Sequence, residues 1–286
     1  MSEVNKNISD RSRQYVVQLL ESVSGKNEKI SSKIPDNVIA FIGLAGGCGA
    51  TTVCCNIASA LKELGYRVII VDTNLMFPSI GYYYDVGDAK SQGDLVSYLG
   101  GDTSLNGSIT NFDKTSLLYS DRCSILDVIS KDDKAGGSLI ADTLASLRAL
   151  YDIVLIDANK DLVYEINNSA VYESDRVFCI MDENISCIAN AEKLKSSMSS
   201  CGIDINKASL IMNKRTSVHY PQNPIDKLGM ELVAVLPFDA SIIESGLAGT
   251  VFYDSGVAYS KNSRVFCESI ASIARKVVSS GGGEVE

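Results

Sequence analysis

Long apolar runs alternate with amphipathic segments along most of this chain of 286 residues. A continuous apolar run is typical of a strand buried on both faces, whereas apolar residues spaced three or four apart indicate a helix. Buried strands are predicted at NVIAFIGLA, YRVIIVDTN, YDIVLIDAN, DRVFCIMDE, KASLIMNK and MELVAVLPFD. Helices are predicted at TTVCCNIASALKELG, LIADTLASLRAL, ISCIANAEKLKSSMSSCG and SRVFCESIASIARKVVSS. This order predicts an α/β fold, with a mostly parallel twisted sheet and helices on both faces.

The two ends of the chain depart from this alternation. Residues 1–37 are expected to form an N-terminal extension, in which Ser12–Ser24 has the spacing of a short amphipathic helix and a polar linker follows. The main domain is expected over residues 38–280, and a flexible glycine-rich tail over residues 281–286.

Charge and cysteine content narrow the class of protein. Lys and Arg number 26 against 35 Asp and Glu, so the net charge is −9, which opposes a main task of gripping nucleic acid. No apolar run has the length of a membrane-spanning helix, and the polar N-terminus lacks a signal sequence, so the cytoplasm is expected. The eight cysteines form no CxxC pair, and with one histidine, His219, zinc spacing is absent. Cys48 alone lies in a glycine loop, where it either fills space or has a redox role.

That glycine loop, GLAGGCGATTV, joins the first predicted strand to the first predicted helix. Gly43, Gly46, Gly47 and Gly49 let the backbone approach a phosphate, and the helix N-terminus adds a favourable dipole. The general phosphate-binding pattern carries a lysine before its hydroxyl residue, but Ala50 stands there. Similar glycine turns also serve tight packing, so the loop alone leaves both interpretations open.

Two aspartates extend the phosphate-site hypothesis toward a metal. Asp72 ends the second predicted strand and Asp157 the third, and in open α/β sheets ligands bind beyond the carboxyl ends of strands. With the hydroxyl of Thr51, these carboxylates predict a Mg²⁺ environment. The alternative for each aspartate is a turn former or a helix cap.

Taken together, these motifs resemble the ParA/MinD superfamily of deviant-Walker P-loop ATPases over roughly residues 38–278. The family's glycine loop, acidic segment, Walker B strand, adenine element and late proline motif correspond to AGGCGATT, DTN, LIDA, MNK and LPFD. The loop without its lysine looks like the CpaE/TadZ branch, which helps place pilus or secretion machinery, commonly at a cell pole. The resemblance therefore implies a P-loop NTPase-like fold, ATP and Mg²⁺ as ligands, a homodimer, and protein partners in a pilus or secretion assembly. It implies that any polar or membrane location is reached through those partners.

The resemblance also assigns residues to the nucleotide. The loop would offer backbone N–H groups, Thr52 would touch the α-phosphate, and Asn213 would contact the adenine edge with Lys214 and Pro237 nearby. The implied nucleotide-binding residues are Gly46, Gly47, Cys48, Gly49, Ala50, Thr51, Thr52, Asn213, Lys214 and Pro237. The implied metal-binding residues are Thr51, Asp72 and Asp157.

Three positions depart from the family pattern, and all three concern hydrolysis. The signature lysine that reaches across a dimer is Ala45, the P-loop lysine is Ala50, and the acid that orients the attacking water is Asn74. Removing one preorganised charge from phosphoryl transfer commonly costs about 10²–10³ in rate. Backbone N–H groups, the helix dipole and Mg²⁺ remain for binding. The sequence therefore predicts a positioning or scaffold factor that binds ATP and hydrolyses it poorly, and no catalytic residue is assigned.

Two other functions stay open. An active ATPase could borrow its charge from a partner or from another lysine, such as Lys160 after the third predicted strand. A ParA-like DNA-segregation factor would need a basic face. The last helix offers Arg264, Arg275 and Lys276 for such a face, but the chain as a whole is acidic.

Two further segments have a recognisable pattern. The aromatic cluster at residues 81–85 suits either an interface or internal packing, and residues 130–134 are predicted as a charged turn.

Overall fold

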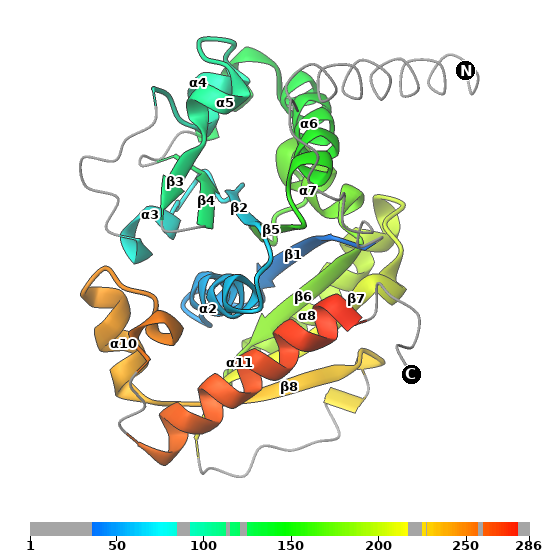
Figure 1. The fold of residues 1–286 in the computed structure, drawn as a ribbon. Helices are drawn as coiled ribbons and strands as arrows, with labels where there is room; N and C mark the ends of the chain where they lie inside the picture. The colour runs from blue at the N-terminus through cyan, green and yellow to red at the C-terminus, as the bar shows by residue number, and fades with distance from the viewer. Residues whose placement is uncertain are drawn as a thin grey trace. The chain divides into compact units, whose positions relative to one another are not determined.

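One sheet forms the centre of the part of the chain that the structure describes. This computed structural model describes residues 36–84, 92–112, 115–120, 125–216, 225–226, 228–256 and 260–279, with the backbone alone for residues 125–135. The described strands follow the order β3-β4-β2-β5-β1-β6-β7-β8 (Figure 1). Their bounds are β1 Val38–Gly43, β2 Val68–Asp72, β3 Thr110–Phe112, β4 Thr115–Leu118, β5 Ile153–Ala158, β6 Arg176–Met181, β7 Ala208–Arg215 and β8 Leu232–Pro237. All neighbours pair in parallel except β3 and β4, which are antiparallel.

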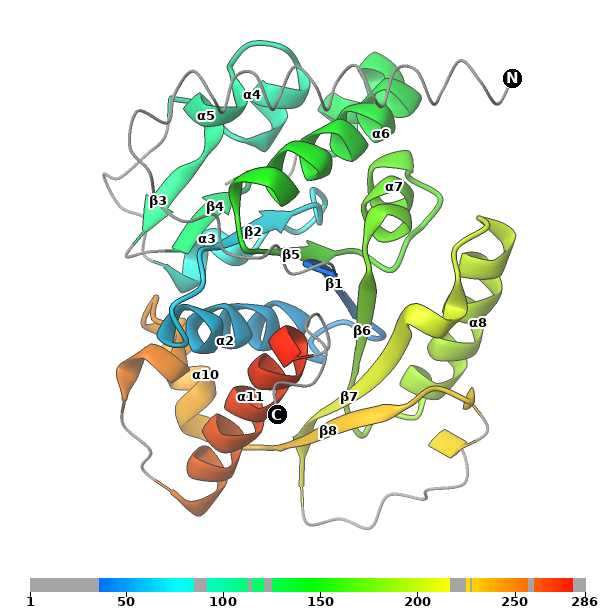
Figure 2. The same cartoon turned by 45° about the vertical axis from the view of Figure 1, so that its right-hand side comes forward.

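Helices cover both faces of this sheet, as Figure 2 shows. Their bounds are α2 Ala50–Glu63, α3 Ile80–Tyr83, α4 Leu95–Leu99, α5 Leu105–Ser108, α6 Ile125–Leu150, α7 Glu165–Glu173, α8 Ser186–Ser200, α10 Ala240–Leu247 and α11 Lys261–Ser279. Short 3₁₀ turns lie at Ile205–Lys207 and Phe252–Ser255. No helix in these described ranges combines the length and the apolar character needed to cross a membrane.

The central strand β1 shows why both faces are apolar. Ala40 and Ile42 point to a core layer completed by α4, α6, α7 and α8, while Ile39 and Phe41 point to a second layer formed with α2 and α11. Side chains alternate between the faces of a strand, so a strand covered on both sides must be apolar at every position. The prediction of a mostly parallel sheet between two helical layers is confirmed.

All of the strands predicted from apolar runs are present, and the differences lie at the sheet edge and in the helices. The sequence prediction missed β3 and β4, which are too short to form a long apolar run. It also missed the helices α3, α4, α5, α7 and α10. The charged turn predicted at residues 130–134 was wrong, because these residues belong to the long helix α6. The predicted helix at residues 12–24, His219 and the tail at residues 281–286 lie outside the described residues.

Candidate nucleotide and metal site

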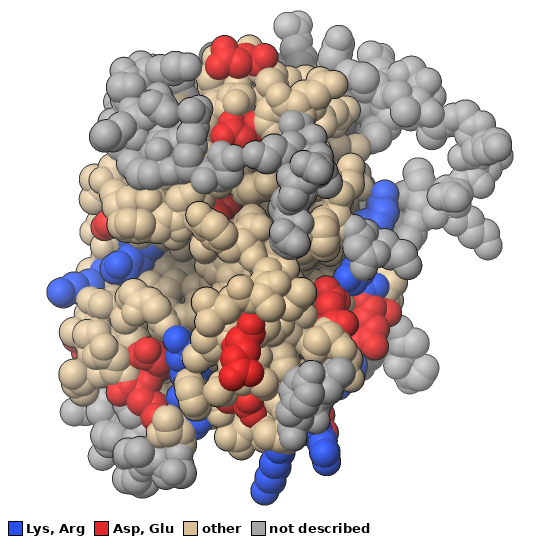
Figure 3. All heavy atoms as spheres, turned by 90° about the vertical axis from the view of Figure 1, so that its left-hand side faces the viewer, with Lys and Arg blue, Asp and Glu red and all other residues tan. Residues whose placement is uncertain are grey.

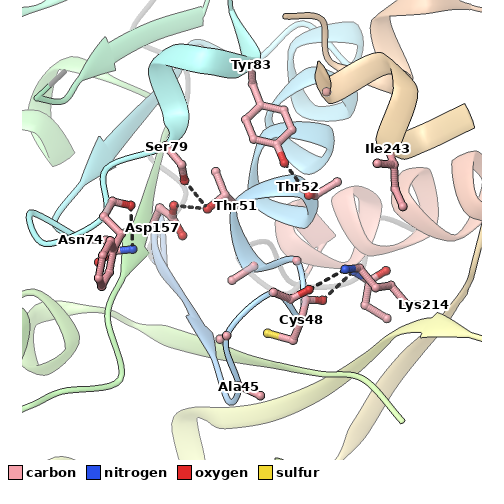
Figure 4. Close-up of a pocket in the computed structure, with 18 of the residues that line it drawn as sticks. Ala45, Cys48, Thr51, Thr52, Asn74, Ser79, Tyr83, Asp157, Lys214 and Ile243 are labelled. Carbon is pink, nitrogen blue, oxygen red and sulfur yellow. Dashed lines mark hydrogen bonds between the residues drawn. The ribbon is translucent and has the colours of Figure 1, made fainter. Parts of the chain in front are cut away.

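A pocket of about 790 Å³ opens at the carboxyl ends of the central strands. The loop between β1 and α2 forms its floor, and α3 and α10 form its sides (Figure 4). Parallel strands bring the ends of β1, β2 and β5 to one edge, so segments far apart in the sequence meet there. From the predicted nucleotide site, the lining includes Gly46, Gly47, Cys48, Gly49, Ala50, Thr51, Thr52, Asn213, Lys214 and Pro237.

The glycine loop leaves the N-terminus of α2 free for an anion. Gly47 and Gly49 have φ values of 75° and 94°, in the left-handed region that favours glycine. Gly49 is the N-cap of α2, and no side chain in the described structure caps this helix end. A Cβ at Gly49 would lie 2.4 Å from Nδ2 of Asn213, so a larger residue would not fit. The exposed N–H groups and the helix dipole therefore form a phosphate-binding geometry without a lysine.

Two residues at the end of β7 hold the carbonyl side of the loop. Nδ2 of Asn213 donates to the carbonyl oxygen of Cys48 at 2.9 Å, and Nζ of Lys214 donates to that of Gly47 at 2.5 Å. Phosphates would meet the N–H groups on the other side of the loop, whereas the amine of Lys214 is bonded to the carbonyl oxygen of Gly47. Lys214 has a φ of 55°, which is uncommon for a residue other than glycine. The residue that bonds to the loop carbonyl of Gly47, Lys214, therefore also has a constrained backbone conformation.

Thr51 and Asp157 meet at the metal end of the pocket. Oγ1 of Thr51 donates to Oδ2 of Asp157 at 2.6 Å, and it lies 2.9 Å from Oγ of Ser79. Asp72 is the register partner of Asp157 across β2 and β5, but it is fully buried and does not line the pocket. Its carboxylate accepts from the backbone N–H groups of Asn74 at 3.0 Å and Ser79 at 3.1 Å. Asp72 therefore orders the segment after β2, and a metal would reach it through water.

Asp72 and Asp157 are buried carboxylates, and no positively charged side chain among the described residues balances them. Burial raises the pKa of Asp157 to about 6, against a hydrogen bond from Thr51 that lowers it. Burial, and then the charge of Asp157, raise the pKa of Asp72 well above its ordinary value. Neither forms an ion pair within the described residues. No cluster of three or more acidic, histidine or cysteine side chains is found in the same part of the chain, so phosphate oxygens would have to complete a Mg²⁺ shell. One carboxylate, one hydroxyl and phosphates suit Mg²⁺.

The residue in the place of the water-orienting acid is tied to a neighbouring amide. Nδ2 of Asn159 donates to Oδ1 of Asn74 at 3.0 Å, while Nδ2 of Asn74 donates to the carbonyl oxygen of Phe77 at 3.2 Å. An amide cannot accept a proton as a carboxylate can. The side chain of Asn74 is thus satisfied by the protein and carries no basic group.

The lysine candidate beyond β5 has no competing ion pair. Lys160 lines the pocket, is exposed, and forms no ion pair among the residues that the structure describes.

The cysteine of the glycine loop, Cys48, is buried, with 2% of its surface exposed, and burial raises the pKa of its thiol. A thiol with a raised pKa carries little thiolate, so a redox role for Cys48 is not supported.

Sequence reasoning located most of this pocket but missed three polar side chains. Of the predicted site residues, only Asp72 lies behind the lining. Asn159 follows Asp157 by two positions, just beyond the end of a predicted strand, and this position could have indicated that it lines the pocket. Ser79 pairs with Thr51, and the hydroxyl of Tyr83 lies 2.7 Å from Oγ1 of Thr52. Both come from α3 and its start, a segment whose sequence gives no motif for a phosphate site.

Comparison with known proteins supports the same fold. The family model described as an AAA domain matches residues 36–208. The septum site-determining protein MinD of Thermotoga maritima is 21% identical over 255 residues, which cover 86% of this chain and 89% of that protein. The solved structure of MinD from Pyrococcus horikoshii, complexed with Mg-ADP, is 25% identical with a TM-score of 0.70, covering 87% of this chain and 99% of that one. A ParA family ATPase from Chlorobium tepidum is 18% identical with a TM-score of 0.71, covering 85% and 99%.

Proposed function

This chain belongs to the family of AAA domains and, within it, to the ParA/MinD superfamily of P-loop ATPases; on that premise we propose that it is a positioning or scaffold factor that binds Mg²⁺ and ATP or ADP with little hydrolysis. The observation that carries the proposal is an open α2 N-terminus that no described side chain caps, beside Ala50 and Asn74 in the places of the P-loop lysine and the water-orienting acid. Backbone groups suffice for binding, whereas hydrolysis needs charges that these residues lack. When bound, Mg²⁺ would rest on Thr51 and Asp157 and supply the positive charge that the loop lacks.

We expect the purified protein to bind ADP and ATP with affinities within about tenfold of each other, because the loop has no lysine that would stabilise the additional γ-phosphate of ATP. Calorimetric titration with each nucleotide, with and without Mg²⁺, measures the binding, and a phosphate-release assay on the same samples measures turnover. Binding without turnover is the expected result. Robust Mg²⁺-dependent ATP turnover would contradict the proposal. If a Lys160→Ala variant then lost this turnover, Lys160 would supply the missing charge, as in the active-ATPase alternative.

The proposed factor acts as a homodimer across the face that carries the pocket. Phe77 and Leu247 line the pocket and are 71% and 84% exposed. Figure 3 looks onto the side of α3 and α10 and shows a hollowed surface in which uncharged residues predominate. Exposed apolar groups that gather on one face favour association.

Because Ala45 has no amine to reach a partner's phosphates, dimerisation should not distinguish ATP from ADP. Sedimentation of the wild-type chain with each nucleotide should give the same dimer fraction. Phe77→Asp together with Leu247→Asp should shift the protein to monomer, because two charges would be buried in the interface. Leu64→Asp, an exposed position at the far end of α2, is the matched control and should leave the dimer intact. A dimer that needs ATP, or that survives the paired substitution, would contradict this interface.

We place this factor in the cytoplasm, acting on a pilus or secretion assembly. The support is the lysine-free loop GGCGATT, which looks like that of the CpaE/TadZ branch. A strain without the gene should lose the surface assembly while segregating its DNA normally. Normal assembly with failed segregation would instead favour the DNA-segregation alternative.

A further inference from the structure

We propose that Tyr83 positions the α-phosphate of the bound nucleotide by acting through Thr52. The inference rests on the proposed nucleotide binding and adds a residue that lies outside the glycine loop. Tyr83 ends the short helix α3, and its hydroxyl lies 2.7 Å from Oγ1 of Thr52 (Figure 4). Both side chains line the pocket.

The place of Thr52 in the loop indicates which phosphate it meets. Thr51 is turned toward Asp157, where a metal and the terminal phosphates would lie. Thr52 is turned away from Asp157, toward Tyr83 and the side where Ile243 of α10 lies (Figure 4). It belongs to the first turn of α2, whose N–H groups have no side-chain cap among the described residues. The phosphate nearest to Thr52 is therefore the one closest to the sugar.

The two hydroxyl groups hold two protons and share one hydrogen bond, so one proton is left to donate into the pocket. If Tyr83 donates to Thr52, the proton of Thr52 is free to point at a phosphate oxygen. A hydrogen bond received by a hydroxyl strengthens the one that it gives. Tyr83 thus turns Thr52 into an oriented donor, at a loop that holds Ala50 in place of a lysine.

The packing of the ring fixes the hydroxyl of Tyr83 in this position. A Cβ at Gly246 would lie 3.2 Å from Cε1 of Tyr83, so the backbone of α10 approaches the ring closely. Burial raises the pKa of Tyr83, which keeps its hydroxyl protonated and able to donate. Tyr253 lies outside the pocket lining, and its hydroxyl donates to Oε2 of Glu63 at 2.7 Å. Tyr253 therefore provides the matched control, because Tyr253→Phe also removes one hydroxyl hydrogen bond but leaves the pocket unchanged.

The test is calorimetric titration with ADP and with ADP analogues that carry sulfur on the α- or the β-phosphate. We expect Tyr83→Phe to weaken ADP binding by up to about tenfold, because Thr52 loses the hydrogen bond that orients its own proton, and Tyr253→Phe to leave the affinity unchanged. Sulfur accepts hydrogen bonds weakly, so α-phosphate sulfur should weaken binding to the wild-type chain and have little further effect on Tyr83→Phe. Sulfur on the β-phosphate should weaken both proteins equally. Tyr83→Phe should also add nothing in a Thr52→Val background.

Several outcomes would overturn the role of Tyr83. Equal ADP affinity of wild type and Tyr83→Phe would do so, as would equal sensitivity of the two proteins to sulfur on the α-phosphate. Failure of the wild-type chain to bind ADP would overturn the proposed function, and the role of Tyr83 with it. If Tyr83→Phe does not fold, Thr52→Val against Thr52→Ser tests the same pair, since serine keeps the hydroxyl and should keep the affinity.

Discussion

A variant that carries Ala45→Lys, Ala50→Lys and Asn74→Asp is expected to hydrolyse ATP about 10²–10³-fold faster than the wild-type chain. The lysine at position 50 would bring charge to the β- and γ-phosphates, and that at position 45 would reach across the proposed dimer. The aspartate would face Nδ2 of Asn159, which already donates to this position at 3.0 Å. A carboxylate held by that amide is oriented and able to accept a proton.

The fold can receive these changes because the positions already line the pocket. Phosphate release under saturating ATP and Mg²⁺ measures the gain. Ala50→Met is the matched control, because it adds length without charge and should not raise turnover. A Thr51→Val change in the restored background should abolish the gain, since Thr51 is a proposed metal ligand. If the restored protein binds ATP as the wild type does and stays inactive, then the lost charges are not what limits hydrolysis.

The fold was predictable because a parallel sheet covered on both faces imposes continuous apolar runs. Each long apolar run corresponds to a strand, from the central β1 to the edge strand β8 with its terminal Pro237. At the opposite edge, β3 and its neighbour β4 span three and four residues, so their apolar pattern is too short to stand out. Residues 130–134 carry charges that suit a turn, yet they lie within the continuous helix α6.

The candidate site divides along the same line. Residues in a motif of fixed spacing, such as Thr51 and Asn213, were predictable because the loop and the strand ends place them. The hydroxyl of Tyr83 was not, because its position depends on how α3 packs against α2 and α10. The burial of Asp72 behind the pocket was equally hidden, because the sequence places it at a strand end but not at a depth. Both the position of the Tyr83 hydroxyl and the depth of Asp72 depend on tertiary packing, which the apolar pattern of the sequence does not reveal.

Replacing Asp157 with asparagine should stabilise the metal-free protein at neutral pH and remove its response to Mg²⁺. Burial raises the pKa of Asp157 to about 6 in the folded state, above the ordinary carboxyl value of 3.8. The folded protein therefore holds this proton more tightly than the unfolded chain, so the group favours folding at low pH. That contribution is lost as pH rises from about 4 through about 6, at a cost of up to about 3 kcal/mol. The asparagine side chain carries no charge and escapes this loss.

Thermal unfolding of both proteins between pH 5 and pH 8, with and without Mg²⁺ and ADP, measures the difference. We expect Asp157→Asn to unfold several degrees higher than wild type at pH 8 without metal, and the gap to narrow toward pH 5. Mg²⁺ with ADP should raise the unfolding temperature of the wild type and leave that of the variant close to its value with ADP alone. Asp152→Asn is the control of opposite sign, because hydrogen bonds from Arg67 lower the pKa of Asp152. Its stabilisation is present above the ordinary carboxyl pKa, so losing it should slightly lower the unfolding temperature across this range. An Asp157→Asn variant that is less stable than wild type at pH 8 would mean that the Asp157 carboxylate is held by a favourable partner, and that the metal is not needed to balance its charge.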